Sequence, residues 1–178
     1  MRVKILKVDK RADIPYQAHA LDYCVDLTAT RMEKIGDNTY KYYLGIALQI
    51  DRKWSKELIS PAFDRRDDGL YGDFSISVKE TSLDMQRSPL KLALKLYPRS
   101  SCYKHGMILV NSTAIIDEGY TGEISVIFYH YDTSLPPYKE GEKVCQMALE
   151  AGLPIDFSSA VILDETDRGS NGYGSSGD

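Results

Sequence analysis

Short apolar runs in which hydrophobic and polar residues alternate are the feature that most limits how this chain can fold. Alternation with a period of two puts successive side chains on opposite faces of a β-strand, whereas an amphipathic helix needs a different spacing. Gly, Pro, Asp and Asn lie between the runs, as turns require, and no segment has the pattern of a capped helix. Strands are therefore expected at Val3–Val8, Tyr40–Ile50, Phe74–Val78, Leu90–Tyr97, Met107–Val110, Glu123–Tyr131, Lys143–Leu149 and Ala160–Leu163.

Many short strands with little helix favour an all-β domain, which could be a sandwich, a jelly roll or a barrel. The chain has 178 residues, which suits one domain, and its 43% hydrophobic residues are enough for a core. We predict a single β domain over residues 1–163 and a flexible Gly-rich segment over residues 164–178. That last segment is rich in Gly and Ser, so it cannot form a core of its own.

Composition excludes several classes of protein. The net charge of -4 argues against broad nucleic-acid binding, which needs a basic face. No apolar run approaches the ~20 residues of a membrane helix, and the N-terminus lacks the apolar stretch of a signal peptide, so we expect a cytosolic protein. Cys24, Cys102 and Cys145 are widely spaced, which fits free thiols better than a disulfide framework or a zinc site.

The C-terminal segment places a cation and an aromatic residue among glycines. Glycine lets backbone N–H groups approach a phosphate, Arg168 can bind phosphate through two N–H groups, and Tyr173 offers a ring face to a base. A disordered terminus is the alternative interpretation.

Two further segments combine polar groups with strand ends. Arg99 followed by Ser100 and Ser101 is either a phosphate site or an ordinary turn after a strand. Gln146 lies among apolar neighbours, where its amide needs a partner from the protein or from a ligand.

Residues 111–123 predict a β-hairpin with its corner at Asp117–Tyr120. Asp117 ends an Ile-Ile run, and a partly shielded carboxylate can become basic enough to act as a general base. An Asp that simply begins a turn is the common alternative.

Five segments in this order resemble the five motifs of the dUTP pyrophosphatase (dUTPase) family. They are Tyr23–Ala29, Pro98–Gly106, Ala114–Gly122, Gly141–Gln146 and Thr166–Gly177. The resemblance covers about residues 1–50 and 93–178 and implies a distorted jelly-roll or β-barrel fold, a homotrimer, and Mg²⁺-dependent hydrolysis of dUTP to dUMP and pyrophosphate.

The resemblance also implies roles for individual residues. Asp117 would activate the water that attacks the α-phosphorus, and Tyr120 would pack on the deoxyribose. Backbone groups of the hairpin, including Ile116, would contact the uracil edge, with help from the side chain of Asn111.

The phosphate end of the substrate would be held by the other motifs. Arg99, Ser100 and Ser101 would lie by the phosphates, Gln146 would reach the α-phosphate, and Asp26 would order water around Mg²⁺, which itself binds the three phosphates. The C-terminal segment would act as a lid that clamps the terminal phosphate and covers the uracil. In this family the lid closes over the site of a neighbouring subunit. Its candidate contacts are Arg168, Gly172, Tyr173, Gly174 and Ser175.

The chain departs from the family pattern mainly by an insertion at Asp51–Leu92. This insertion is expected to be a β-hairpin or arm on the outside of the barrel, or a docking surface for a partner protein. Smaller departures put Cys24 and Ala114 where the family has Gly, and Glu142 where it has Asp.

Two alternative functions share this fold. A dCTP deaminase needs a catalytic Glu on the strand after the corner, where this chain has Ile127. A non-catalytic regulator would use nucleotide-dependent ordering of the C-terminal segment to control a partner, and Asp117→Ala would leave such a protein unaffected.

Overall fold

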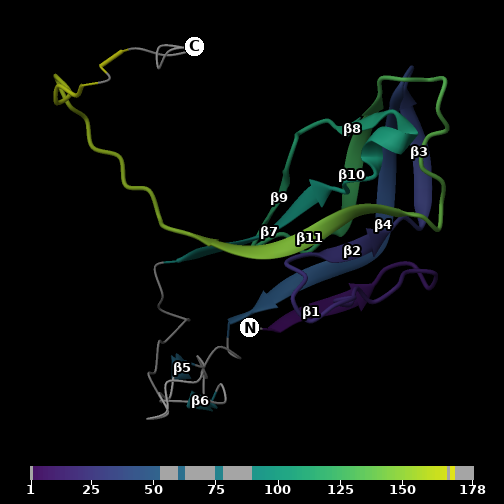
Figure 1. The fold of residues 1–178 in the computed structure, drawn as a ribbon, viewed down its shortest axis with the longest axis horizontal. Coiled ribbons are helices and arrows are strands. Elements are labelled where there is room, and N and C mark those ends of the chain that lie inside the picture. The colour runs from purple at the N-terminus through teal and green to yellow at the C-terminus, as the bar shows by residue number, and fades with distance from the viewer. Residues whose placement is uncertain (1, 53–59, 63–74, 78–89, 168, 171–178) are drawn as a thin grey trace, which may run out of the picture.

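A computed structural model of the chain describes residues 2–52, 60–62, 75–77, 90–167 and 169–170. Within these ranges the regular structure is β, apart from the short 3-10 helix η2 (Cys102–His105), and there is no α-helix. The main strands form two sheets that share one core (Figure 1). The predicted all-β fold is therefore confirmed.

The first sheet is built around one long strand, β4 (Thr39–Asp51). Its strand order is β1-β4-β10-β8, with β3 also paired to β4. The first part of β4 pairs with β3 and the last part with β1, so the two short strands follow one another along the same partner. The other members of this sheet are β1 (Arg2–Lys7), β3 (Arg31–Gly36), β8 (Met107–Leu109) and β10 (Glu123–His130).

Gly45 lies where β4 changes partner from β3 to β1. Its φ is +65°, and a Cβ there would lie 2.7 Å from Thr30 Cγ2. The backbone N–H groups of Val8 and Asp9 both donate to the Gly45 carbonyl, at 2.8 and 3.0 Å. Only glycine fits this positive φ and this close approach without strain.

The second sheet has the strand order β2-β11-β7-β9, contains Asp26 and Gln146, and leads at the end of β7 into Arg99. Leu92, Leu94 and Leu96 of β7 are buried, while the residues between them face away from the core. This period-two pattern is the one that the sequence predicted. The strands are β2 (Val25–Thr28), β7 (Lys91–Pro98), β9 (Ala114–Asp117) and β11 (Lys143–Gly152).

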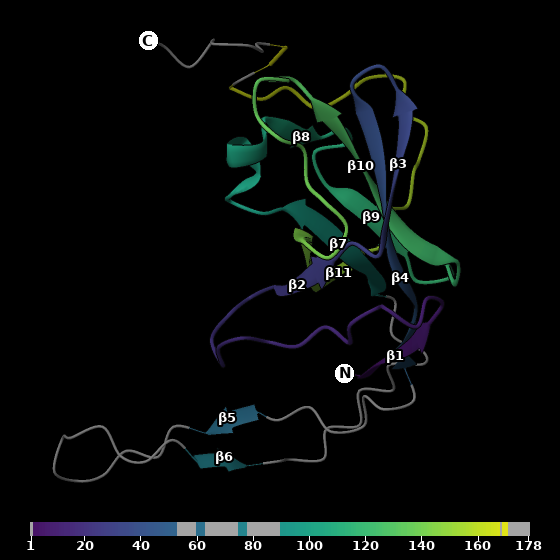
Figure 2. The same ribbon diagram turned by 90° about the vertical axis from the view of Figure 1, so that its right-hand side faces the viewer.

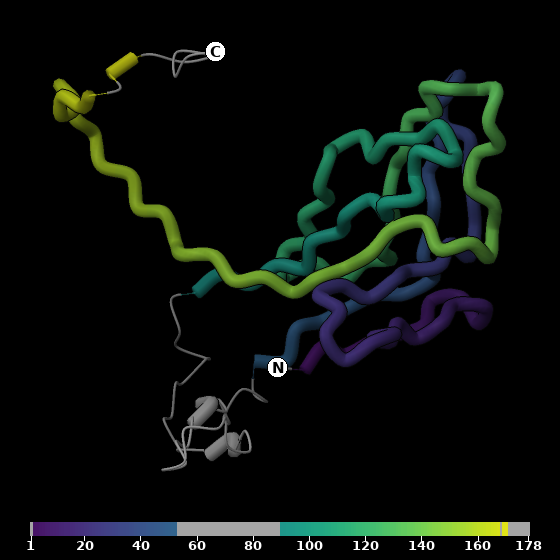
Figure 3. Tube along the Cα trace, viewed as in Figure 1, coloured from purple at the N-terminus to yellow at the C-terminus, as the bar shows by residue number. Residues whose placement is uncertain are grey.

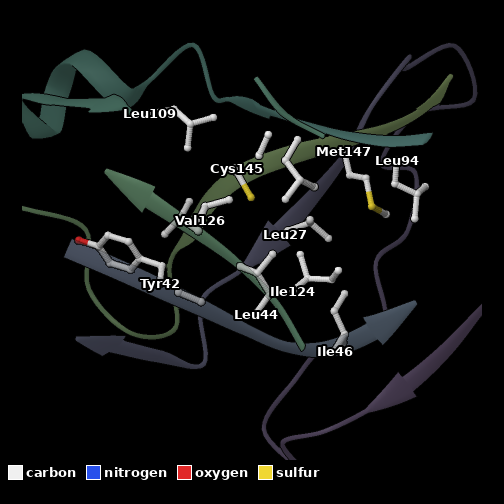
Figure 4. Close-up of a cluster of buried hydrophobic side chains, with 14 of the residues drawn as sticks. Leu27, Tyr42, Leu44, Ile46, Leu94, Leu109, Ile124, Val126, Cys145 and Met147 are labelled. Carbon is white, nitrogen blue, oxygen red and sulfur yellow. The ribbon is translucent and has the colours of Figure 1, made fainter. Parts of the chain in front are cut away.

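The core lies between the inner faces of the two sheets (Figure 4). Leu27, Leu94 and Met147 come from the second sheet, and Leu44 and Val126 come from the first. Each such side chain contributes about 1.5–3 kcal/mol when it leaves water, so this shared core holds the two sheets together.

The strand predictions are largely confirmed, with ends that differ by at most three residues. One is wrong: Ala160–Leu163 forms no strand, and its aliphatic side chains are exposed. Strand propensity alone does not make a strand when the chain offers no neighbouring strand to pair with. Two strands of the main sheets were not predicted, β2 and the mostly exposed β3.

The hairpin predicted at residues 111–123 is also wrong. β9 pairs with β7 in the second sheet, whereas β10 pairs with β4 and β8 in the first. The turn after Asp117 therefore passes from one sheet to the other (Figure 2). We call residues 117–122 the inter-sheet corner.

After β11 the chain leaves the two sheets as an extended segment (Figure 3). Its large apolar side chains are exposed, with 88% of Phe157 and 86% of Ile162 accessible to solvent. Within the insertion, β5 (Ser60–Ala62) and β6 (Ser75–Ser77) pair with each other, and the strand expected at Phe74–Val78 is confirmed in part. No helix in the described part of the chain is long and apolar enough to span a membrane.

Candidate active site

A cleft of about 340 Å³ lies at the end of β7, between that strand, β11 and β2. Asp26, Arg99, Ser100 and Gln146 line it, so three of the five predicted motifs meet at one place. The loop before β2 completes the wall with Tyr16, Ala18, Asp22, Tyr23 and Cys24.

The sheet register brings these residues together. Gln146 of β11 lies opposite Asp26 of β2 on one side and opposite Tyr97 of β7 on the other. The Gln146 side-chain amide donates to the Pro98 carbonyl at 3.0 Å, one residue before Arg99. The amide that needed a partner therefore binds the backbone beside the cleft.

Asp26 is held between two cations. Arg99 donates to it through Nε at 2.8 Å and Nη2 at 3.3 Å, and Lys143 donates through Nζ at 3.1 Å. Desolvation acts to raise the pKa of Asp26, but the hydrogen bonds from Arg99 and Lys143 outweigh it and keep this pKa below its ordinary value. The cleft therefore presents an ionised carboxylate flanked by two positive groups.

Lys143 also lines the cleft, although the sequence assigned no role to it. Simple alternation puts it on the opposite face from Gln146, three residues later, but the β11–β2 register shifts between Lys143 and Cys145. This bulge returns Lys143 to the face of Asp26 and Gln146. A cation within the predicted Gly141–Gln146 motif was the available sequence signal.

The turn after Arg99 is compact. Cys102 N–H donates to the Arg99 carbonyl at 3.0 Å, η2 follows, and Gly106 ends it with a φ of +57°. Arg99 Nη1 lies 3.5 Å from the Ser101 hydroxyl, so Ser101 is near the guanidinium, while Ser100 is exposed at the cleft.

The inter-sheet corner holds the predicted general base. Asp117 is exposed at the end of β9, Ile116 packs against the core, and Tyr120 N–H donates to the Asp117 carbonyl at 2.9 Å. Tyr120 Oη donates to the Glu123 carbonyl at 3.1 Å. Asn111 lies at the other end of β9, in the exposed turn before that strand.

Within one chain the corner and the cleft are separated. Asp117 pairs with Ala93, six residues before Arg99 along β7. At about 3.3 Å per strand residue this places the two roughly 15 to 20 Å apart. The remaining predicted contacts, Arg168, Gly172, Tyr173, Gly174 and Ser175, lie outside the described residues.

Comparisons with known proteins identify the family of this chain. The dUTPase family model matches residues 75–177. A deoxyuridine 5'-triphosphate nucleotidohydrolase from Clostridium kluyveri is 30% identical over 136 residues, covering 71% of this chain and 95% of the relative. The chain belongs to the dUTPase family. The family that the sequence predicted is thereby confirmed.

Three other dUTPases match most or all of this chain, one in sequence and two in fold. The enzyme of the same name from Clostridium novyi is 28% identical and covers 99% of both chains. The structure of the Staphylococcus bacteriophage 80alpha dUTPase with dUPNHPP shares the fold, with a TM-score of 0.64 at 14% identity over 99% of this chain and 98% of that one. A dUTPase variant from phage phi11 of S. aureus, with a structural Mg(II) ion, has a TM-score of 0.59 at 11% identity over 93% of this chain and 100% of that one.

Proposed function

We propose that this chain hydrolyses dUTP to dUMP and pyrophosphate by attack of water on the α-phosphorus. Family membership supports the reaction, and the cleft that gathers Asp26, Arg99, Ser100 and Gln146 supports the place of the phosphates. That convergence of three motifs distant in sequence is the single observation on which the proposal depends.

The cleft residues suit a chain of phosphates. Arg99 and Lys143 bring positive charge, and the exposed Ser100 hydroxyl and the nearby Ser101 hydroxyl can donate to phosphate oxygens. Gln146, fixed against the Pro98 carbonyl, would lie by the α-phosphate. In the proposal Arg168 reaches the terminal phosphate, and Tyr173 covers the uracil with Gly172, Gly174 and Ser175 around it.

The inter-sheet corner suits proton removal. Asp117 is an exposed carboxylate on a short strand whose backbone is fixed by pairing with β7. It would take the proton of the attacking water while Tyr120 packs on the deoxyribose. Backbone groups near Ile116 and the Asn111 side chain would contact the uracil.

Magnesium fits this donor set as an ion carried by the substrate. Both carboxylate oxygens of Asp26 already accept hydrogen bonds from cations, so Asp26 is suited to hold metal-bound water. In the described ranges no group of three or more His, Cys, Asp or Glu side chains could hold a metal by itself. When bound, Mg²⁺ would neutralise part of the phosphate charge.

The distance between Asp117 and Arg99 supports a site shared between copies. If one copy supplies the cleft and the next supplies the corner, the two copies meet head to tail, and contacts of this kind form a ring when the rotation closes. We propose that the ring closes after three copies, as a homotrimer. A partner protein at the 51–92 insertion and a cytosolic location stay predictions from the sequence.

The decisive measurement is pyrophosphate release from dUTP, dTTP, dCTP and UTP, with and without Mg²⁺. We expect strong preference for dUTP, dependence on Mg²⁺, and a loss of at least about a hundredfold in kcat for Asp117→Asn, because the general base is removed. Equal rates with dUTP and dTTP would exclude a uracil-specific pocket.

Deamination of dCTP is not favoured. Ile127 of β10 is a half-buried aliphatic residue opposite Lys41, so it cannot transfer protons at the position where a deaminase needs a Glu. The same assay tests this point, because a deaminase would consume dCTP without releasing pyrophosphate.

A further inference from the structure

Three distant segments of the chain meet at the Glu118 carboxylate. Arg52 Nη2 donates to Glu118 Oε2 at 2.6 Å and to the Leu90 carbonyl at 2.8 Å. Arg52 Nε also donates to Glu118 Oε1, so the guanidinium holds the carboxylate at two points. We call this group of Arg52, Glu118 and the Leu90 carbonyl the corner clamp.

The corner clamp is more than an ordinary surface ion pair. The Arg52 and Glu118 side chains are only 21% and 29% exposed, and two-point contact fixes their relative orientation. The hydrogen bond from Arg52 lowers the pKa of Glu118, so the pair stays charged at neutral pH. It joins the end of β4, the approach to β7 and the inter-sheet corner.

The clamp lies directly beside the candidate general base. Before Asp117 the backbone is fixed by the β9–β7 register, and the next residue is Glu118. The corner is also held by Tyr120, whose N–H donates to the Asp117 carbonyl and whose hydroxyl donates to the Glu123 carbonyl. The clamp therefore restrains the chain immediately after Asp117, where a small rotation would redirect its carboxylate.

We propose that Arg52 and Glu118 are positioning residues for catalysis, which keep the Asp117 carboxylate directed at the attacking water. This inference rests on the proposed function. Neither residue touches the substrate in this scheme, because both act through the backbone of the inter-sheet corner.

Tyr120 is anchored independently of the clamp. Its hydroxyl donates to the Glu123 carbonyl at 3.1 Å, and its ring lies so close to Gly122 that a Cβ there would come within 2.6 Å of Tyr120 Oη. Loss of the clamp should therefore misdirect Asp117 while the sugar contact stays in place. The chemical step and the selection of the sugar should respond differently.

The test is a double-mutant cycle with Arg52→Met, Glu118→Gln and the double variant. Because a misplacement of about 1 Å can cost as much as a hundredfold, each single change is expected to lower kcat by about tenfold or more. KM and the ratio of dUTP to UTP turnover should stay within about twofold of wild type, because ground-state binding is retained. The double variant should be no slower than the slower single variant, since both changes break the Arg52–Glu118 pair and only Arg52→Met also removes the contact with the Leu90 carbonyl.

A neighbouring ion pair provides the matched control. Lys4 Nζ lies 3.6 Å from Asp51 Oδ2, one residue before Arg52, and this contact does not involve the corner. Lys4→Met should leave kcat unchanged. Thermal melting and sedimentation of every variant separate loss of positioning from loss of folding or assembly, and Arg52→Lys, which keeps the charge without the two-point contact, replaces any variant that does not fold.

The outcomes distinguish the two proposals. A wild-type protein that does not hydrolyse dUTP, or an active Asp117→Ala variant, would overturn the proposed function itself. If wild type is active and Asp117→Ala is not, then unchanged kcat in both clamp variants, or losses that multiply in the double variant, would overturn the clamp alone.

Discussion

Two buried tyrosines differ in the hydrogen bonding of their hydroxyl groups. Tyr42 and Tyr138 pack edge to face, with ring centroids 6.2 Å apart. Tyr42 Oη donates to the Tyr138 carbonyl at 3.0 Å, whereas Tyr138 Oη has no hydrogen-bond partner within the described ranges. Burial raises the pKa of Tyr138 to about 12, against a smaller opposing effect of the nearby Ser101 hydroxyl, so the phenol stays protonated.

Removing the two hydroxyls should change the free energy of unfolding differently. Tyr42→Phe should lower the free energy of unfolding by about 1 kcal/mol, because it removes a buried hydrogen bond and leaves a carbonyl unpaired. Tyr138→Phe should leave it unchanged or raise it by up to about 1 kcal/mol, because a desolvated hydroxyl is removed. Urea unfolding of the two matched variants measures both, and a clear loss for Tyr138→Phe would mean that its hydroxyl is bonded to Ser101.

At the scale of elements, β4 organises the first sheet because it changes partner part-way along. Tyr43 pairs with Arg31 of β3, and Ile46 pairs with Lys7 of β1. Gly45 lies between these two registers and accepts hydrogen bonds from the chain after β1. The bend at Gly45 therefore decides where one pairing ends and the next begins.

Gly45→Ala should destabilise the protein strongly, although it adds only one methyl group. The positive φ alone costs a residue with a side chain about 1–3 kcal/mol, and contact with Thr30 and Asp9 adds to it. Gly152→Ala is the control, since a Cβ there meets nothing and the change should stay within about 0.5 kcal/mol. Equal melting temperatures for the two variants would contradict this account of β4.

The elements that the sequence predicted are those with a buried face. β7 shows why: Leu92, Leu94 and Leu96 alternate with outward residues, and this pattern is readable without a structure. β3 was missed because almost all of its residues are exposed, so it shows no alternation. Lys143 was missed because a bulge, which depends on the partner strand, decides which face it occupies.

At the scale of the whole molecule, the predicted site is divided. The motifs name the candidate site residues, and three motifs meet in the cleft, but Asp117 lies at the far end of the second sheet. Local pattern carries no information about which copy of a chain supplies a residue. The exposed apolar side chains after β11, including Phe157 and Ile162, also favour contact with another copy.

Mixing two inactive variants tests the shared site. Arg99→Ala disables the cleft and Asp117→Ala disables the corner, so each homotrimer should be inactive. After the variants are denatured and refolded together in equal amounts, about a quarter of the sites should combine an intact cleft with an intact corner from the next copy. Recovery of dUTP hydrolysis towards that level supports the trimer, and a mixture that stays inactive would mean that each chain builds its own site.

The contact between Arg52 and Leu90 in the corner clamp also bears on how the insertion can change during evolution. The Arg52 side chain binds the Leu90 carbonyl although 37 residues separate them, so the two ends of this segment lie close together beside the sheets. Any replacement whose two ends can be brought together satisfies the same geometry, because neither sheet has to adjust. The segment between Arg52 and Leu90 can therefore be exchanged or deleted during evolution, while the two sheets and the candidate site that they carry stay unchanged.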